Sequence, residues 1–254
     1  MCSEEIILRK DLLGDLGVLM NEQATFQDHI NKVCNTVNKK AAWILRTFNS
    51  RGTNFMKTLW NQLVQGHIDY CSQLYQPQQS TNLTKIENLM KRYTKKIPQI
   101  ASLNYWQRLK ALKMNSQQRR FERYRIIYIW KILEGKVQNC GVLVNPNQDS
   151  RRGRFCDIPP ISRSASARVK SLREGTLQVQ GARLFNSLPA KIRNLNKCSE
   201  AEFKEALDDY LTRIPDEPMV GGLLPRAISL VTGNHSNSLV DQIRVFRGTG
   251  GTKD

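Results

Sequence analysis

The chain has 254 residues, 40% of them hydrophobic, and its 39 Lys and Arg against 22 Asp and Glu give a net charge of +17. This length and apolar content exclude a fully disordered chain and allow one large domain or two small ones. No stretch approaches the roughly 18 apolar residues of a membrane-spanning helix, so we expect no integral membrane protein.

The N-terminus and the cysteines indicate an intracellular protein of the nucleus or cytoplasm. Glu4 and Glu5 stand where a signal or transit peptide would carry basic or long apolar sequence. The six cysteines, at positions 2, 34, 71, 140, 156 and 198, never form a CxxC motif. We therefore expect reduced, mostly buried thiols rather than disulfides.

The first elements in chain order are a short strand segment and two helices. A glycine-punctuated apolar segment, residues 12–19, predicts a strand and turn. Apolar residues then recur every three or four positions and predict a helix of about six turns that Thr25 caps. Thr53 is expected to cap a second helix, which ends or kinks near Gly66.

A third helix is half apolar and half cationic. After a loop at 76–82, one face repeats Leu83, Ile86, Met90, Tyr93 and Ile97, and Pro98 ends the helix. The opposite face carries four cations: Lys91, Arg92, Lys95 and Lys96. A short helix at about 104–112 follows.

Ser116 is expected to cap a long helix over 117–134, with Gly135 in the left-handed position after its end. The first half of this helix contains Arg119, Arg120, Arg123 and Arg125. Cations at a helix N-terminus oppose the helix dipole, and a negatively charged partner would relieve this.

Helical signals weaken after residue 135. Residues 168–193 predict a short helix that Pro189 ends, and Ser199 with Glu202 forms a capping box for a last helix. The predicted fold class is mainly α, a helical bundle with a short N-terminal strand segment and a flexible C-terminal tail. Its predicted parts are a strand segment at 1–20, a helical domain at 21–135, a basic linker at 136–167, a small helical unit at 168–214 and a flexible tail at 215–254.

The excess positive charge lies in two blocks. Residues 91–131 hold twelve basic groups and one acid, Glu122, and residues 151–193 hold ten basic and two acidic groups. Such concentration is typical of proteins that bind a polyanion, most often nucleic acid. The alternative is a solvated basic face with no specific partner.

Two arrangements could suggest a metal site, and both have a simpler interpretation. Asp208 and Asp209 are adjacent on a predicted helix and diverge by about 100°, so we interpret them as a solvated helix face. His67 and Cys71 are four residues apart but have no further ligands nearby, which favours buried structural residues. No nucleotide-binding or metalloprotease motif occurs, so the sequence predicts no catalytic residue, cofactor, metal or small-molecule substrate.

Residues 5–214 contain a series of short motifs in a definite order. They are Leu16-Gly17-Val18, the run from Trp43 to Phe48, the run from Val64 to Pro77, Ile86-Glu87, the run from Tyr93 to Pro98, Tyr105 with Arg108-Leu109, Gln118-Arg119-Arg120, Tyr128 with Lys131-Ile132-Leu133 and Gly135, the run from Leu184 to Pro189, and Phe203-Lys204. Together they resemble the C-terminal part of a non-LTR retrotransposon reverse transcriptase of the jockey and CR1-like kind. Phe185 departs from the family pattern, which has Trp there.

This resemblance implies a thumb and downstream region without catalysis of its own. In that family the polymerase aspartates belong to a palm domain upstream of the matched region, and the endonuclease lies further upstream. We therefore expect a non-enzymatic, thumb-like fragment of an RNA-directed DNA polymerase. Its implied partners are RNA or an RNA–DNA hybrid, bound without sequence preference, and a separate palm-containing polypeptide.

The expected nucleic-acid-binding residues are the cations of the two basic helices and of the linker. They are Lys91, Arg92, Lys95, Lys96, Arg119, Arg120, Arg123, Arg125, Arg151, Arg152 and Arg154. Tyr93 and Tyr124 are interpreted as core residues, and the Lys91–Lys96 cluster equally fits a nuclear import signal. Two other hypotheses stay open: an inert relic or host-retained scaffold that acts through protein contacts, and one segment of a longer active polymerase.

Overall fold

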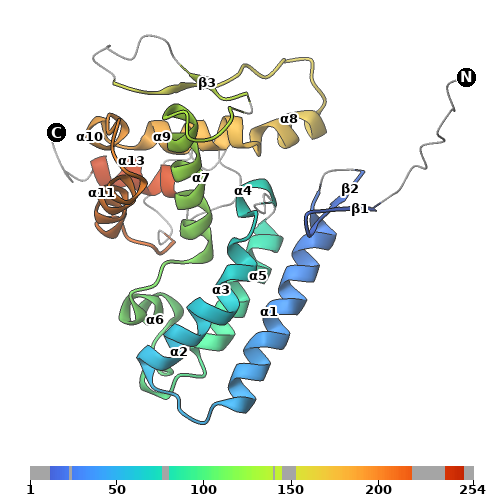
Figure 1. Ribbon diagram of the computed structural model, residues 1–254, viewed down its shortest axis with the longest axis vertical. Helices are drawn as coiled ribbons and strands as arrows, with labels where there is room; N and C mark the ends of the chain where they lie inside the picture. The colour runs from blue at the N-terminus through green and yellow to red at the C-terminus, as the bar shows by residue number, and fades with distance from the viewer. Residues whose placement is uncertain are drawn as a thin grey trace, which may run out of the picture. The chain divides into compact units, whose positions relative to one another are not determined.

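The computed structural model describes residues 12–22, 25–75, 80–139, 141–144, 153–218 and 238–248 (Figure 1). These residues are mainly helical, with two short strand pairs, as the sequence predicts. The chain divides into two compact units, one up to Leu103 and one from Asn104 onward. The predicted domain boundary near residue 135 is therefore wrong.

The first unit consists of a hairpin and a set of helices. Its elements are β1 (Leu12–Asp15), β2 (Val18–Asn21), α1 (Gln27–Thr47), α2 (Thr53–Leu59), the π-helical turn η1 (Trp60–Val64), α3 (Gln65–Asp69), α4 (Ser72–Tyr75), α5 (Ser80–Thr94) and the 3₁₀ turn η2 (Pro98–Ile100). The loop predicted at 76–82 is shorter, because α5 begins at Ser80; residues 76–79 lie outside the described residues.

The hairpin confirms the predicted strand and turn. β1 and β2 pair antiparallel, with Leu12 opposite Asn21 and Asp15 opposite Val18. The two residues of the turn, Leu16 and Gly17, both have positive φ, at 44° and 84°. Positive φ at both turn positions matches the right-handed twist of the strands, and only glycine adopts it without strain.

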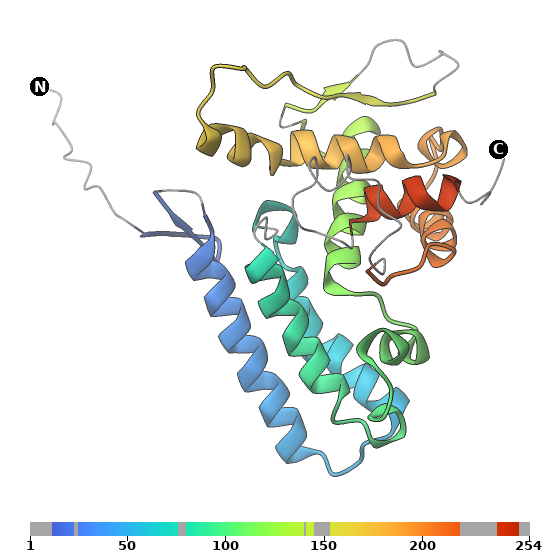
Figure 2. The same cartoon turned by 180° about the vertical axis from the view of Figure 1, so that it is seen from behind.

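The core of the first unit is built by the predicted apolar faces. α1 lies beside α5 in both views (Figures 1 and 2). Their buried side chains include Ile30, Val37 and Ile44 from α1 and Ile86 and Met90 from α5. The periodicity alone therefore identified the packed side of each helix.

The caps of the first two helices differ from the prediction. Neither α1 nor α2 has a side-chain cap: Phe26 precedes α1 in a left-handed conformation, and Gly52 precedes α2. Thr25 instead accepts a hydrogen bond from Asn21 at 2.7 Å, and Thr53 is the first residue of α2. The helical irregularity predicted near Gly66 lies slightly earlier, in the π turn η1, and α3 continues through Gly66.

The second unit is built around one long helix. Its elements are α6 (Tyr105–Leu112), α7 (Gln117–Leu133), β3 (Leu143–Val144), β4 (Cys156–Asp157), α8 (Ala167–Glu174), the π-helical turn η3 (Leu177–Gly181), α9 (Ala182–Ser187), α10 (Ala190–Arg193), α11 (Glu200–Thr212) and α13 (Leu239–Gly248). The predicted caps of α7 and α11 are confirmed, since Ser116 accepts from the Arg119 N–H and Ser199 forms a capping box with Glu202. Gly135 has φ of 67°, as predicted.

A single hydrophobic cluster joins α7 to the C-terminal helices. Trp130 of α7 stacks on Phe203 of α11, with ring centroids 4.5 Å apart and planes 7° from parallel. Phe185 of α9 is fully buried in the same cluster, as are Leu239 and Ile243 of α13. Because these contacts join α7 to residues far along the chain, α7 belongs to the second unit rather than to the helices of the first unit.

Three predictions for the C-terminal half are corrected. The single short helix expected over 168–193 is a series of short segments, and Pro189 precedes α10 instead of ending the region. The linker at 136–167 contains the strand pair β3–β4. The predicted tail includes α13, whose apolar face is buried; residues 219–237 and 249–254 lie outside the described residues.

Candidate nucleic-acid interface

The end of α5 presents cations on the side opposite its buried face. Tyr93 and Ile97 are buried, whereas Arg92, Lys95 and Lys96 are exposed and Lys91 is half-buried. We call Lys91, Arg92, Lys95 and Lys96 the α5 strip. The sequence predicts a helix up to residue 97, but α5 ends at Thr94, so Lys95 and Lys96 lie in the turn that follows it and Ile97 is extended.

Tyr93 is a core residue, as predicted. Its hydroxyl donates to the Met56 carbonyl at 2.9 Å, and its ring lies 4.8 Å from that of Trp60. Burial raises the pKa of Tyr93 to about 12. The Tyr93 ring therefore packs in the core under the α5 strip and is not available to stack on a base.

Further cations of the first unit lie on α1. Lys39 and Arg46 are exposed and Lys40 is half-buried. Arg92 of the α5 strip donates to the side-chain oxygen of Asn38 on α1, at 2.8 Å. This hydrogen bond connects the two helices at their surface. The cations of α1 and of the α5 strip therefore lie on two neighbouring, connected elements.

The cations of α1 are missing from the sequence-based site, although a signal for them exists. No Asp or Glu occurs between Asp28 and Asp69, a stretch with six Lys and Arg, or between Glu87 and Glu122, a stretch with nine. Acids before residue 29 balance the count over residues 1–50 and hide this charge. The distance between successive acids is thus a better indicator here than the net charge of a window.

Two of the four α7 arginines predicted to bind nucleic acid are buried, which the sequence does not predict. Arg119 is 1% exposed and Arg125 is 4% exposed. Eleven residues of this helix are buried, including Glu122 and three consecutive residues before Arg120. A helix so covered has no continuous cationic face.

Arg119 holds the C-terminal segments against α7. Its guanidinium donates to the carbonyls of Leu211, Ile214 and Pro215 and to the side chain of Gln242. Asp216 lies 3.8 Å from its Nε and accepts hydrogen bonds from the backbone N–H and hydroxyl of Ser116. Arg119 therefore satisfies one carbonyl in the last turn of α11 and two in the segment that follows it, a structural role.

Arg125 and Arg154 are also structural. Arg125 donates to the Gly175 carbonyl at 3.2 Å, and burial lowers its pKa to about 10. Arg154 pairs with Glu134 at 2.7 Å, and both side chains are largely buried. Arg154, also predicted to bind phosphate, is thus enclosed by its own chain, whereas Arg151 and Arg152 lie outside the described residues.

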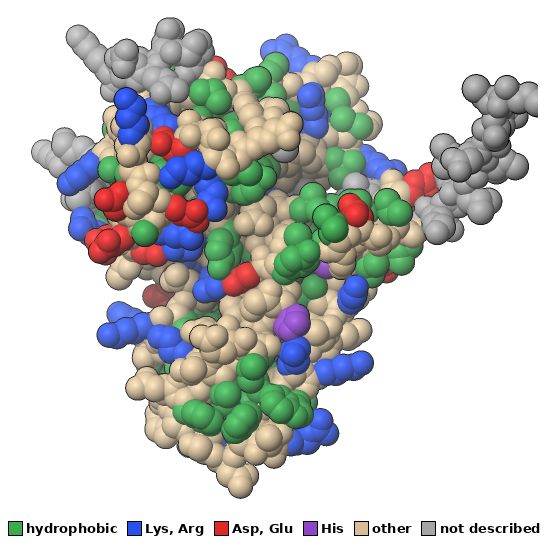
Figure 3. Space-filling view, viewed as in Figure 1, with side chains coloured by type: hydrophobic (Ala, Val, Ile, Leu, Met, Phe, Trp, Pro, Cys, Tyr) green, Lys and Arg blue, Asp and Glu red, His purple; other side chains and the backbone are tan. Residues whose placement is uncertain are grey.

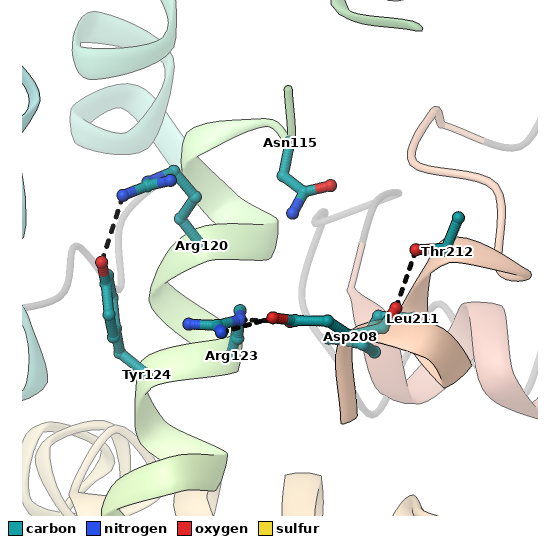
Figure 4. A pocket seen from close by; sticks show the side chains of 7 residues that line it. All are labelled: Asn115, Arg120, Arg123, Tyr124, Asp208, Leu211 and Thr212. Carbon is teal, nitrogen blue, oxygen red and sulfur yellow. Dashed lines mark hydrogen bonds and ion pairs between the residues drawn. The ribbon is translucent and has the colours of Figure 1, made fainter. Parts of the chain in front are cut away.

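The other two arginines of α7 line a pocket in the second unit (Figure 4). Arg120 donates to the Tyr124 hydroxyl at 3.1 Å, and both guanidinium groups lie beside the Tyr124 ring, 5.7 and 5.8 Å from its centre. Arg123 forms a two-point ion pair with Asp208 of α11, with N–O distances of 2.5 and 2.6 Å. Tyr124 is half-buried, which partly confirms its interpretation as a core residue.

The pocket has a volume of about 270 Å³ and a mostly polar lining. Its residues are Asn115, Arg120, Arg123, Tyr124, Asp208, Leu211 and Thr212. Two guanidinium groups and one carboxylate leave one formal positive charge, so the pocket can accept an anionic group such as a phosphate. Asp208 opposes such an anion, because it already occupies the two donors of Arg123 that face it.

The structure shows where the two pairs of possible metal ligands lie. Asp209 is exposed while Asp208 pairs with Arg123, which confirms a solvated helix face rather than a convergent pair. His67 is exposed and Cys71 is half-buried after the end of α3, so the prediction that both are buried is wrong. Among the described residues, no group of three or more His, Cys, Asp or Glu is placed to hold a metal ion.

Cysteine burial also differs from the prediction. Of the four described cysteines, Cys156 is buried, whereas Cys34, Cys71 and Cys198 are partly accessible, and all four are unpaired. In the part of the chain that the structure covers, no helix has the length and apolar character needed to cross a membrane.

Comparisons with known proteins identify no relative. No protein-family model, no curated protein and no solved structure matches this chain.

Proposed function

We propose that this chain binds RNA or an RNA–DNA hybrid through its backbone phosphates, without sequence readout and without catalysis. The observation that carries the proposal is the long acid-free sequence around the exposed cations of α1 and the α5 strip. Exposed cations release counterions from a polyanion when they bind its phosphates, and this supplies non-specific affinity.

The order of motifs supports a finer proposal. The chain is the thumb-like, non-catalytic part of a retrotransposon reverse transcriptase, and its helices hold a template–primer duplex by the backbone. The evidence for this origin is the sequence resemblance alone. A separate palm-containing polypeptide remains the second proposed partner.

The first test is binding of the purified chain to a fluorescent RNA–DNA hybrid across a salt titration. Replacing Lys91, Arg92, Lys95 and Lys96 by Gln should weaken binding at low salt, because phosphate contacts are lost. The slope of log affinity against log salt should become shallower by roughly 0.7–0.9 for each contact removed. Gln preserves helix propensity, so α5 should stay folded.

The matched control changes the same number of charges elsewhere. Arg163, Arg168, Lys170 and Arg173 lie in or beside α8, which buries none of its residues. Replacing these four by Gln gives an equal change in net charge. An equal loss of slope in both variants would show that the α5 strip contributes no more to binding than the cations of α8 do.

A second prediction concerns the carboxylate in the pocket. Replacing Asp208 by Asn should tighten binding to the hybrid by about 2- to 10-fold at low salt, because it removes a repelling charge and releases the Arg123 guanidinium. Loss of this partly exposed ion pair should cost about 1 kcal/mol of stability or less.

Asp209→Asn is the matched control for Asp208→Asn, since Asp209 is the exposed neighbour on the same helix. Both variants raise the net charge by one, but only Asp208 pairs with Arg123. If the two variants tighten binding equally in the same titration, the pocket has no part in binding.

A second candidate function is docking to another protein. Near the hairpin, several large apolar side chains of the first unit are about half exposed or more: Leu12, Leu13, Leu16, Tyr70 and Leu74. The Tyr70 hydroxyl donates to the Leu16 carbonyl at 2.8 Å, which brings the hairpin turn beside the end of α3. Exposed apolar patches often contact other proteins, and a host-retained scaffold would use one. Light scattering that shows a monomer at all concentrations would argue against self-association through this patch.

A further inference from the structure

Trp43 is a large aromatic side chain at the surface of α1. It is 47% exposed, whereas Trp60 and Trp130 are fully buried. Aromatic side chains bury much apolar area when they pack, so exposure of half a tryptophan is costly to solvate and typical of a binding surface.

Trp43 belongs to a cluster of three aromatic rings where α1 ends and α2 begins. Its ring lies 5.9 Å from that of Phe48, and Phe48 lies 5.6 Å from Phe55, both edge to face. Phe55 is 39% exposed. Figure 3 shows a hydrophobic patch over this part of the first unit, with Lys and Arg side chains beside it. We call Trp43, Phe48 and Phe55 the aromatic patch.

The connection between α1 and α2 is held in place from inside. The Arg51 guanidinium donates to the Leu45 carbonyl at 2.5 Å and contacts the Met56 sulfur at 4.0 Å. These contacts tie the loop back onto the end of α1. The rings are therefore presented by a fixed turn and do not need to be ordered when a ligand binds.

Cations surround Trp43 on its own helix. Lys39 and Lys40 precede it by four and three residues, and Arg46 follows it by three. Residues three and four apart are neighbours on a helix surface, so an exposed ring lies between cations one turn before and one turn after it. No acid occurs in α1 after Asp28, so this charge is not offset within the helix.

We propose that the aromatic patch stacks unpaired nucleobases of a single-stranded segment, while Lys39, Lys40 and Arg46 hold its phosphates. The inference rests on the proposed function and adds a second mode of binding to it, directed at single strands. Aromatic rings stack on any base, and flanking cations follow the backbone, which is the combination found in non-specific single-strand binders.

An anionic membrane surface is the other polyanion that the aromatic patch could contact. The residues around the aromatic patch favour nucleic acid instead. Thr47, Asn49, Ser50 and Asn54 are exposed around the rings. These neutral donors and acceptors can pair with base edges, whereas a tip that enters lipid is apolar at its leading residues.

The test compares Trp43→Ala with the wild-type chain on three fluorescent probes. They are a single-stranded thymidine oligomer of about 12 nucleotides, within the range of single-strand site sizes, an abasic oligomer of equal length, and the RNA–DNA hybrid. Trp43→Ala should weaken binding to the thymidine oligomer by about 5- to 150-fold. Binding to the abasic oligomer and to the hybrid should change less than twofold.

Trp43→Phe should restore most of the affinity, because it keeps a ring, and circular dichroism checks that both variants fold. If the wild-type chain binds the hybrid but binds thymidine and abasic oligomers equally, stacking is excluded and the proposed function stands. If it binds none of the probes at low salt, the proposed function fails as well. Phosphatidylserine vesicles test the membrane alternative. If Trp43→Ala loses the vesicle binding of the wild-type chain but binds the oligomers as before, the aromatic patch binds membranes and the inference is overturned.

Discussion

Replacing Arg119 by Met should destabilise the second unit by about 3–5 kcal/mol. Arg119 is 1% exposed and donates to three backbone carbonyls and to Gln242. Its loss leaves those acceptors without their donor and removes the positive charge 3.8 Å from Asp216. An unsatisfied buried polar group costs far more than a hydrogen bond contributes. Urea unfolding, followed by tryptophan fluorescence, measures the change.

Arg120→Met is the matched control, because Arg120 is the next residue and is half-buried beside Tyr124. It should cost about 1 kcal/mol or less. If Arg119→Met were as stable as this control and bound the hybrid more weakly, Arg119 would be a phosphate ligand, as the sequence predicts, and its structural role would be wrong.

Glu122 should make the second unit less stable as the pH rises from about 4.5 to 7. Its side chain is buried, and desolvation raises its pKa from 4.5 to about 7, although Arg119 partly offsets this. The folded state therefore holds the proton more tightly than the unfolded chain. The resulting stabilisation is complete below the unfolded pKa and is lost by about pH 7, and it amounts to about 3 kcal/mol.

Glu122→Gln should abolish this pH dependence. Glutamine keeps the oxygen that accepts the Leu239 N–H at the start of α13, at 3.0 Å in the native chain, and it cannot ionise. The measurement is the free energy of unfolding at pH 5 and pH 7.5, compared between variant and wild type. The comparison cancels the opposite contribution of His29, whose pKa burial lowers.

Glu205→Gln is the control, since Glu205 is exposed on α11. It should unfold with the pH dependence of the wild-type chain. A Glu122→Gln variant that kept the wild-type slope would show that some other group is responsible for it.

The sequence predicted that cations on α5 would be exposed, and it missed the burial of two arginines on α7. On α5 the apolar residues occupy one side, so the helical period places Arg92 in solvent. Lys95 and Lys96 are exposed in the turn after α5. On α7 neither side is uniformly polar, and Arg119 finds its acceptors more than 90 residues further along the chain. No local pattern reveals those carbonyls, so a buried arginine and a phosphate-binding arginine look alike in the sequence.

What the sequence determined by itself was local. It identified the apolar faces of α1 and α5, the caps of α7 and α11 and the left-handed Gly135, because these depend on residues within one or two turns. The tertiary structure alone decided that α7 joins the second unit, that α13 packs on the core and that Arg119 is enclosed. Those outcomes depend on apolar area and backbone acceptors supplied by distant segments, which spacing along the chain does not encode.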